Sequence, residues 1–388
     1  MRIANFMDSS LRDLDTKGVF SGVGETYNPG NAYELVLHFT PHGQDLAMAP
    51  RLADHRIEVI VHSGDGVSLR RCGRALGLVL GQLRRRRIQL VRGRLPYLGS
   101  LIGVAAARLL GLPSVVSLGG DNRIVQERNN SYYYGRRWLS YGMEWLTLRL
   151  ATRIIVPNHF TKDYVAAILG AGLAGRKSVV IPWISAPVAE SCPDDGEIMR
   201  GLGISDDRVV IPVIGFLNRY KYTDILFDAL NAEPPAAAGG RRPLFLFCGD
   251  GPLRAEGERR FAGRDHVRFA GWQDRTVIHA VLRRAGLVLV PMSGLVPLEA
   301  ASLGRPVVAS RVEWHPELIE HGVTGLLVDP DDPQDWRRAI ARLLDGGSEP
   351  AAMAEALRRR YWQTYSPDAV AAEEARLYRT LTARRDAP

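Results

Sequence analysis

The sequence is poor in the residues that form disulfides or bind structural metals. Its three cysteines, Cys72, Cys192 and Cys248, lie far apart and show no C-x-x-C spacing, so neither a disulfide framework nor a zinc site is indicated. The histidines show no H-x-x-x-H spacing, and no G-x-x-x-x-G-K-[ST] loop occurs. These absences exclude the common zinc-enzyme and P-loop patterns. We therefore expect no bound metal and no cofactor.

Long apolar runs are missing as well. No uninterrupted apolar run reaches the length of about 18 residues that a membrane-spanning helix requires. The first residues, MRIANFMDSS, lack the apolar centre of a signal peptide, so we expect a cytoplasmic protein. Of the 388 residues, 46% are hydrophobic and 24% are charged, which is typical of a folded chain with two domains of ordinary size.

Acidic residues are scarce in the first half only. Residues 1–190 contain 24 lysines and arginines against 14 acidic residues, whereas the remainder contains 26 against 28. The densest basic run is Arg84–Arg87, which follows an apolar helical segment. This run could end a helix, where cations are favoured, or it could contact an acidic acceptor or the inner face of an anionic membrane. No aromatic platform or reading motif accompanies it, so we expect no specific nucleic-acid partner.

Short apolar runs alternate with helical segments along both halves of the chain. The runs expected to form strands are 88–91, 113–121, 153–158 and 178–184, and then 209–216, 243–251, 266–272, 286–292, 305–311 and 324–330. This alternation predicts doubly wound parallel sheets with helices on both faces. The polar stretch 186–208, rich in glycine and proline, indicates a linker. We therefore expect one domain at 1–185 and a second at 209–362.

The stretch GLVPLEAASLGRPVVAS, residues 294–310, contains a carboxylate in an apolar setting. Glu299 is the only charged residue between positions 285 and 304, and burying it without a partner would be costly. It could merely neutralise the dipole of a helix that begins nearby, which contributes roughly 0.3–1 kcal/mol. We favour a ligand: Glu299 binds a ribose, while N–H groups at the helix start hold a phosphate. The donor-binding set expected at this turn is Ser293, Gly294, Leu295 and Glu299.

Two further turns in the second half carry candidate residues. Lys221 is the only lysine of that half, and it lies just after a predicted strand, where a compact ammonium suits phosphate oxygens. Arg219 could add a second positive charge, although both could also be solvent-exposed loop charges. After the next predicted strand, Gly249, Asp250 and Gly251 form a turn in which glycine permits positive φ and close backbone approach.

The first half offers glycine-containing turns at the expected strand ends. Asp121 follows such a turn and could bind a sugar hydroxyl, accept a proton or form an Asx-turn. The segment FSGVGETYNPG, residues 20–30, is expected to be a long loop that either lies across a ligand or is flexible. The residues expected to line the acceptor side of a ligand cleft are Gly22, Gly24, Gly119, Gly120 and His159.

Together these segments resemble the retaining GT-B glycosyltransferases of family 4. The matching pieces keep one order along the chain: YKYTD, CGDGPL, VRFAGW, LVPMSGLVPLEAASLGRPVVAS, ELIEHGVTGLLVDPDD and WRRAIARLLD. They cover nearly all of residues 209–345, and the first half matches more loosely. The resemblance implies an α/β GT-B fold, in which two Rossmann-like domains face a central cleft. It also implies a closing helix at about 363–388 that packs back on the first domain.

The resemblance further implies roles for the candidate residues. The second domain would hold a nucleotide-diphosphate sugar, and Lys221 matches the lysine that neutralises the donor diphosphate. Glu299 matches the second glutamate of the family's Glu-x7-Glu motif, which binds the ribose. The first glutamate of that motif corresponds to Pro291, and the family's arginine before the lysine corresponds to Phe216. Arg219 would then assist Lys221.

The expected activity is transfer of a sugar, with retention of anomeric configuration, to an unidentified acceptor in the first domain. The acceptor could be a glycan, a lipid-linked molecule or a small molecule, and Asp121 would contact it or the sugar. The resemblance implies that no metal is needed. Two alternatives remain open: a nucleotide-sugar epimerase of the same fold, and a non-catalytic homologue.

Overall fold

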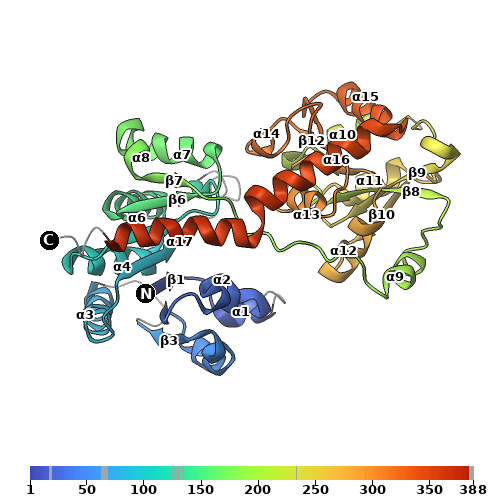
Figure 1. The fold of residues 1–388 in the computed structure, drawn as a ribbon. Coiled ribbons are helices and arrows are strands. Elements are labelled where there is room, and N and C mark those ends of the chain that lie inside the picture. The colour runs from blue at the N-terminus through green and yellow to red at the C-terminus, as the bar shows by residue number, and fades with distance from the viewer. Residues whose placement is uncertain are drawn as a thin grey trace. The chain divides into compact units, whose positions relative to one another are not determined.

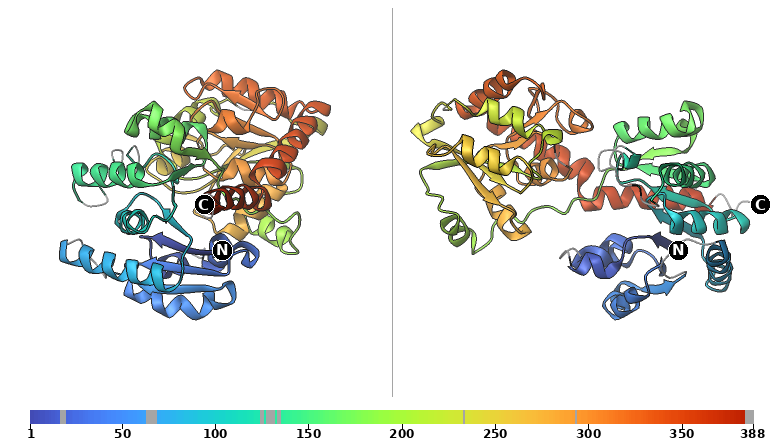
Figure 2. Two further views of the ribbon diagram at one scale, coloured as in Figure 1. Left: turned by 60° about the vertical axis from the view of Figure 1, so that its left-hand side comes forward. Right: turned by 180° about the vertical axis from the view of Figure 1, so that it is seen from behind.

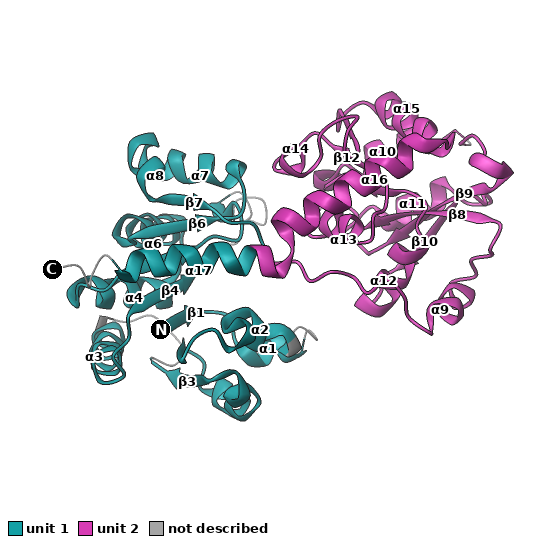
Figure 3. Ribbon diagram, in the orientation of Figure 1, with its two compact units in different colours: residues 1–183, 370–388 teal, residues 184–369 magenta. Residues whose placement is uncertain are grey.

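The computed structural model describes residues 1–16, 20–62, 69–123, 126, 132, 135–232, 234–292 and 294–383. The chain divides into two compact units (Figure 1, Figure 3). Unit 1 comprises residues 1–183 together with 370–388, and unit 2 comprises residues 184–369. Each unit is built on one parallel sheet, so the predicted class of two doubly wound α/β domains is confirmed.

The sheet of unit 1 has the strand order β3-β2-β1-β4-β5-β6-β7. Its strands are β1 (Arg2–Met7), β2 (Leu35–Thr40), β3 (Ile57–Val61), β4 (Leu90–Arg94), β5 (Ser114–Ser117), β6 (Arg153–Val156) and β7 (Ser178–Val180). Ile3 of β1 pairs with Val36 of β2 on one side and with Leu90 of β4 on the other. Strands β4 to β7 correspond to apolar runs that the sequence indicates, because strands buried on both faces have nearly continuous apolar sequences. Strands β1, β2 and β3 are not among the expected runs.

Helices cover both faces of this sheet (Figure 2). They are α1 (Leu11–Thr16), α2 (Val23–Tyr27), α3 (Leu69–Arg85), α4 (Leu98–Leu109), α6 (Arg137–Leu150), α7 (His159–Leu169) and α8 (Ala171–Lys177). Helices α3, α4, α6 and α7 pack each against the next. Right-handed crossovers between parallel strands place these four on the same face. Their last turns therefore lie at the edge of the sheet where the following strands begin.

Residues 20–30 are helical, so the prediction of a long loop there is wrong. The segment forms a 3-10 turn (Phe20–Gly22), helix α2 and a second 3-10 turn (Pro29–Asn31). Gly24 of α2 lies so close to the His55 ring that a Cβ atom would come within 2.2 Å of it. Packing against the segment that ends at His55 thus orders residues whose glycines favour a loop in isolation.

The sheet of unit 2 has the strand order β10-β9-β8-β11-β12-β13. Its strands are β8 (Arg208–Ile214), β9 (Arg242–Cys248), β10 (Val267–Gly271), β11 (Val288–Val290), β12 (Val307–Ser310) and β13 (Leu326–Val328). The helices are α9 (Asp195–Gly201), α10 (Thr223–Ala229), α11 (Arg254–Arg260), α12 (Arg275–Arg284), α13 (Val296–Ser302), α14 (His315–Leu318), α15 (Pro333–Leu344) and α16 (Ser348–Arg360). No helix within the described ranges combines the length and the apolar character needed to cross a bilayer.

The stretch 186–208, which the sequence indicates as a linker, contains a helix. Helix α9 contacts α12, and Arg283 of α12 donates to the Asp195 carboxylate at 2.6 Å. Earlier in the stretch, the Val188 N–H donates to Ser302 Oγ at 3.1 Å. Much of this polar segment therefore packs on unit 2.

The last helix, α17 (Pro367–Ala383), places a carboxylate beside a buried arginine of unit 1. Arg92 of β4 is fully buried, and it donates to Asn5 Oδ1 at 3.0 Å and to the Tyr27 carbonyl at 3.2 Å. Glu374 of α17 lies 3.6 Å from its guanidinium. Burial would lower the pKa of Arg92, but Tyr378 and Glu374 outweigh this and raise the pKa. Helix α17, labelled in Figure 1, thus neutralises a charge in the interior of unit 1.

We expect Glu374→Gln to destabilise the protein by about 3 kcal/mol, because Arg92 is left as a buried charge without its counter-ion. Urea unfolding measures this loss. Glu373→Gln is the matched control, since the exposed Glu373 pairs with Arg376 on the same helix and with no other described residue. Equal stability of the two variants would contradict the proposed role of Glu374.

Candidate functional site

The strand order of unit 2 defines where a ligand site is expected. From β8 the chain moves outward through β9 to β10, and it then returns to place β11 on the other side of β8. The chain leaves β8 and β11 in opposite directions, so the loops that follow these two strands separate. They leave a crevice at the carboxyl ends of the strands, where α/β sheets bind ligands. The loop after β8 carries Lys221, and the segment after β11 leads to Glu299. The topology therefore brings the two strongest sequence candidates to one edge of one sheet.

The turns after β8 and β9 are joined through their backbones. The Leu217 N–H donates to the Asp250 carbonyl at 2.8 Å, and the Leu253 N–H donates to the Leu217 carbonyl at 3.1 Å. Gly249 and Gly251 have φ of 159° and 153°. Added Cβ atoms would lie only 1.8 Å from the Gly215 carbonyl oxygen and 2.3 Å from that of Leu217. Glycine is therefore needed here for contact between two protein loops, and no ligand is required to explain it.

Lys221 lies at the end of a short 3-10 turn (Arg219–Lys221) that Asn218 caps. The Asn218 Oδ1 accepts the Lys221 N–H at 2.9 Å. The half-buried ammonium lies 3.4 Å from the position that a Cβ of Gly215 would occupy, so it folds back over the end of β8. Burial lowers the pKa of Lys221, and Glu313 opposes this. No carboxylate in the described part of the chain lies within ion-pair distance of this ammonium.

The neighbours of Lys221 differ in how much positive charge they add. Arg219 is exposed, with 79% of its side-chain surface accessible, and lies 3.8 Å from Asp224. Phe216 is 54% exposed. Glu313, in the loop after β12, accepts a hydrogen bond from Tyr220 Oη at 3.1 Å. This contact, which the sequence does not indicate, joins the loops after β8 and β12 across the end of β11.

Glu299 is buried in the first turn of α13, as predicted, but the protein itself supplies a partner. Arg275 of α12 donates to Glu299 Oε1 at 2.8 Å, and His279 Nε2 lies 3.9 Å away. Burial raises the pKa of Tyr361 to about 12, and the Glu299 carboxylate contributes to this rise. Arg275 thus compensates the charge of Glu299 in a way that the sequence does not indicate, in addition to the helix dipole and the expected ligand. Among the described residues, however, no donor reaches its second oxygen.

The turn before α13 is described only in part. Ser293, one of the predicted donor-binding residues, lies outside the described residues. Gly294 and Leu295 precede the helix, and Leu295 accepts the Glu299 N–H at 3.0 Å. Their own N–H groups donate to no acceptor in the ranges that the structure describes. The predicted phosphate contacts of these two residues remain a prediction.

The first-half candidates lie at the carboxyl ends of the unit 1 strands. Gly119, Gly120 and half-buried Asp121 follow β5, while His159 follows β6 and begins α7. Strands β5 and β6 are neighbours, so these residues share one edge of the sheet. Gly22 and Gly24 belong to the segment between β1 and β2 instead; Gly22 is exposed and Gly24 is buried.

Three ionisable groups that the sequence does not indicate meet at the same edge. Asp8 follows β1, His42 follows β2 and His62 follows β3. The His42 Nε2 lies 2.7 Å from the Asp8 carbonyl oxygen, and the Gly99 N–H of α4 donates to Asp8 Oδ1 at 3.0 Å. Burial raises the pKa of Asp8 to about 6 and lowers that of His62 to about 4. The sheet brings these residues together although 34 positions separate Asp8 from His42 and 20 separate His42 from His62, and single-sequence spacing carries no such signal.

No described group of three histidine, cysteine or acidic side chains lies close enough together to hold a metal ion. The cavities that we describe in units 1 and 2 lie at the amino ends of the strands, away from Lys221 and Glu299.

Comparison with known proteins identifies relatives of the chain. A family model described as glycosyl transferases group 1 matches residues 208–346. The alpha-D-kanosaminyltransferase of Streptomyces kanamyceticus is 31% identical over 296 residues, which are 74% of this chain and 73% of that protein. The D-inositol 3-phosphate glycosyltransferase of Actinosynnema mirum is 32% identical over 207 residues, which are 50% of this chain and 49% of that protein. The chain thus spans about half the length of the second relative.

A solved structure with the same architecture is that of HepE from Anabaena in complex with UDP. It covers 98% of this chain and 100% of that chain, with a TM-score of 0.74 and 19% sequence identity. The same protein has also been solved in complex with UDP-glucose. At this identity the likeness establishes the fold, which is that of the GT-B glycosyltransferases.

The raised pKa of Asp8 predicts a pH-dependent stability effect. Because the folded pKa, about 6, exceeds the ordinary value of 3.8, the ionised carboxylate destabilises the folded state above pH 6, and this cost disappears as the pH falls towards 4. We expect Asp8→Asn to raise the free energy of unfolding by about 2 kcal/mol at pH 7.5 and to have little effect near pH 4. Urea unfolding across this range measures the difference.

Asp45→Asn is the matched control for Asp8→Asn. Burial would raise the pKa of Asp45, but hydrogen bonds from Ser10 and Thr40, at 2.6 and 2.7 Å, outweigh this and lower it. Its removal should therefore destabilise the protein at pH 7.5. Loss of stability in both variants would show that Asp8 is well solvated or paired.

Proposed function

Since this chain belongs to the glycosyl transferases group 1 family, we propose that it transfers a sugar from a nucleotide-diphosphate sugar to an acceptor. In this proposal unit 2 binds the donor, unit 1 binds the acceptor, and the anomeric configuration of the sugar is retained. No bound metal is required, because Lys221 and Arg219 supply the positive charge that faces the donor diphosphate.

The proposal depends mainly on the burial of the Lys221 ammonium and on its lack of a carboxylate partner among the described residues. This ammonium is half-buried at the crevice edge of the sheet. Partial desolvation without a counter-ion disfavours the charged form, which is why burial lowers its pKa. A diphosphate would supply the missing negative charge. Fixed positive charge at a departing diphosphate is also the kind of electrostatic stabilisation that contributes most to catalysis.

Glu299 and Arg275 form the second part of the proposed donor site. Arg275 occupies one carboxylate oxygen and holds the side chain in one orientation. The second oxygen is then available to accept hydrogen bonds from the hydroxyls of a ribose. The arginine thus gives the buried carboxylate one charged partner before the donor binds, and a ligand completes its hydrogen bonds.

The acceptor is proposed to bind at the carboxyl ends of the unit 1 strands. Asp121, Gly119, Gly120 and His159 share that edge, and Asp121 would contact the acceptor or the transferred sugar. Retention rests on the resemblance of the second-half motifs to retaining enzymes. The alternatives, an epimerase and a non-catalytic homologue, gain no support from the two sequence relatives described above, since both are transferases.

The test of this function is a donor panel followed by product analysis. UDP-sugars come first, because the solved HepE complexes contain UDP and UDP-glucose, and GDP- and ADP-sugars follow. Thermal stabilisation by a donor, then sugar transfer to the small acceptors tested with it, would support the proposal, and NMR of the product would give the anomeric configuration. Undiminished turnover in EDTA is expected. An inverted product would refute retention, and isomerised sugar nucleotide without transfer would favour the epimerase.

We expect Lys221 and Glu299 to be distinguishable with two ligands. Lys221→Met should weaken binding of both pyrophosphate and the nucleoside diphosphate, because it removes charge from the phosphate subsite. Glu299→Gln should weaken binding of the nucleoside diphosphate roughly tenfold or more. Binding of pyrophosphate should be unchanged, since pyrophosphate has no ribose. With the true donor, Lys221→Met should lower kcat/KM by on the order of a hundredfold or more. Calorimetry and initial rates measure these effects.

Arg241→Met is the matched control for Lys221→Met. Arg241 is exposed at the amino end of the unit 2 sheet and is not ion-paired within the described ranges, so this variant removes one positive charge of unit 2 far from the crevice edge. The proposed site is wrong if the Lys221 and Arg241 variants bind both ligands equally well.

A further inference from the structure

Basic side chains collect at the amino edge of the unit 1 sheet, opposite the edge that carries the candidate acceptor residues. The strands begin at this edge, and the last turns of α3, α4, α6 and α8 lie beside them. We call this group the basic edge; its members are Arg2, Arg84, Arg85, Arg87, Arg108, Arg149, Arg153, Arg176 and Lys177. From the sequence only the Arg84–Arg87 run is apparent, because the other members are spread over nearly the whole unit.

Most of these charges have no counter-ion in the part of the chain that the structure describes. Arg2 pairs with Glu34, and the adjacent Arg86 pairs with Glu58 at 2.7 Å. Within the ranges that the structure describes, the other members of the basic edge have no carboxylate at ion-pair distance. The edge is therefore a strongly positive surface, and it accounts for much of the excess charge of the first half.

Three of the arginines converge on a cavity with apolar walls. This cavity, of about 420 Å³, is lined by Arg108 of α4, Arg149 of α6 and Arg176 of α8, together with three leucines, Leu150, Leu169 and Leu173. Lys177 lies next to it: burial lowers the pKa of Lys177, and so do Arg108, Arg149 and Arg153. The cations are thus close enough to repel one another, which makes an anion there favourable.

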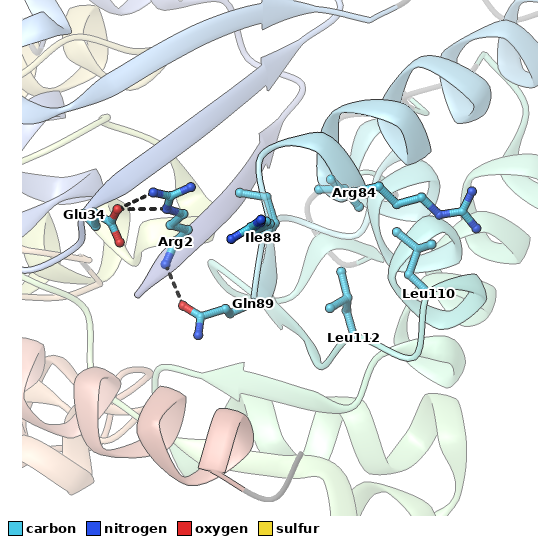
Figure 4. Close-up of a pocket in the computed structure, with 9 residues that line it drawn as sticks. Arg2, Glu34, Arg84, Ile88, Gln89, Leu110 and Leu112 are labelled. Carbon is cyan, nitrogen blue, oxygen red and sulfur yellow. Dashed lines mark hydrogen bonds and ion pairs between the residues drawn. The ribbon is translucent and has the colours of Figure 1, made fainter. Parts of the chain in front are cut away.

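A second cavity at the same edge lies beside the end of α3. It has a volume of about 640 Å³, and its lining includes Arg84, Arg87, Leu110 and Leu112 together with the ion-paired Arg2 and Glu34. Figure 4 shows Arg2 held by Glu34 and Gln89, whereas no interaction is drawn for Arg84, which extends from the helix. Both cavities therefore combine unpaired arginines with leucine side chains.

Large apolar side chains are exposed on the helices that supply this edge. Leu109 of α4 is 65% exposed, and Trp145 and Leu146 of α6 are 42% and 37% exposed. The Arg149 guanidinium lies 5.3 Å from the Trp145 ring centre. Tryptophan, leucine and arginine together are typical of surfaces that enter the headgroup region of a bilayer, because each has an apolar part and the cations reach lipid phosphates.

Helix capping does not account for this arrangement. A cation near a helix C-terminus is favoured by the helix dipole, and Lys177 already meets this need for α6, since its ammonium donates to the carbonyls of Arg149 and Ala151. The Arg149 side chain is therefore not needed to cap α6. Capping also gives no reason for three arginines to share one cavity with leucines.

We propose that the basic edge of unit 1 docks on a membrane surface that contains anionic phospholipid, with lipid phosphates bound at the Arg108, Arg149 and Arg176 cavity. The proposal does not depend on the donor site or on the transferase activity. A bilayer is favoured over a nucleic acid because leucine-lined cavities and exposed leucines have no partner on a phosphate backbone, whereas acyl chains and glycerol carbons supply one.

The test is sedimentation of the full chain with phosphatidylcholine vesicles that contain or lack phosphatidylglycerol. We expect binding only to the anionic vesicles, and weaker binding at high ionic strength. The variant Arg108→Gln/Arg149→Gln/Arg176→Gln should lose vesicle affinity by on the order of a hundredfold. The matched control is Arg200→Gln/Arg241→Gln/Arg259→Gln, which removes three exposed arginines of unit 2 that have no ion-pair partner among the described residues; it should bind as the wild type does.

Three results would overturn the proposal: no binding to anionic vesicles, equal loss of binding in both triple variants, or binding of a mixed-sequence single-stranded RNA through the same arginines without vesicle binding. A second measurement needs only the wild type, so it remains decisive if the triple variant does not fold. Brominated phosphatidylglycerol should quench tryptophan fluorescence, because Trp145 lies at the docking surface. Absence of quenching would likewise contradict the proposal.

Discussion

The contact between the turns at residues 215–217 and 249–251 is the constraint on which the candidate donor site depends. Backbone hydrogen bonds join the two turns, and a side chain at position 249 or 251 would collide with a carbonyl oxygen of the neighbouring turn. This contact fixes the end of β8, and the Asn218 cap then places Lys221 just beyond it. The position of the ammonium is therefore set by backbone geometry, which ligand binding need not reorganise.

Buried charges in the described part of the chain differ in how fully neighbouring groups compensate them. Arg92 has Glu374 and two neutral acceptors, and Glu299 has Arg275, so each of these charges is compensated within its own unit. Asp8 has one N–H donor, and its second oxygen is buried without a hydrogen bond in the described structure. Because a buried charge without a partner is costly, the partly compensated groups are where a ligand or a proton has most effect.

The two edges of the unit 1 sheet have different chemistry. At the carboxyl edge, Asp8, Asp121, His42, His62 and His159 offer acids and imidazoles that suit hydroxyl groups. At the amino edge, arginines and leucines dominate, and the carboxylates of Glu34 and Glu58 are paired with Arg2 and Arg86. A parallel sheet makes this separation possible, because every crossover helix delivers its last turn to one edge and every strand delivers its following loop to the other.

Local sequence pattern was sufficient for the strands of unit 2, for β4 to β7 of unit 1 and for the positions of two candidate site residues. Apolar runs buried on both faces, the lone lysine after β8 and the lone carboxylate in the first turn of α13 are all signals within a few neighbouring residues. Four other features have no such local signal. These are the helical state of residues 20–30, the Arg275–Glu299 pair, the group of Asp8, His42 and His62, and the basic edge. Each of these depends on residues far apart in the chain that pack together, and single-sequence periodicity reports only which face of an element is apolar. The sequence by itself therefore determined the two parallel-sheet domains and the strand ends that carry Lys221 and Glu299, while only the tertiary structure decided which charges are paired, since pairing is a property of distances between elements.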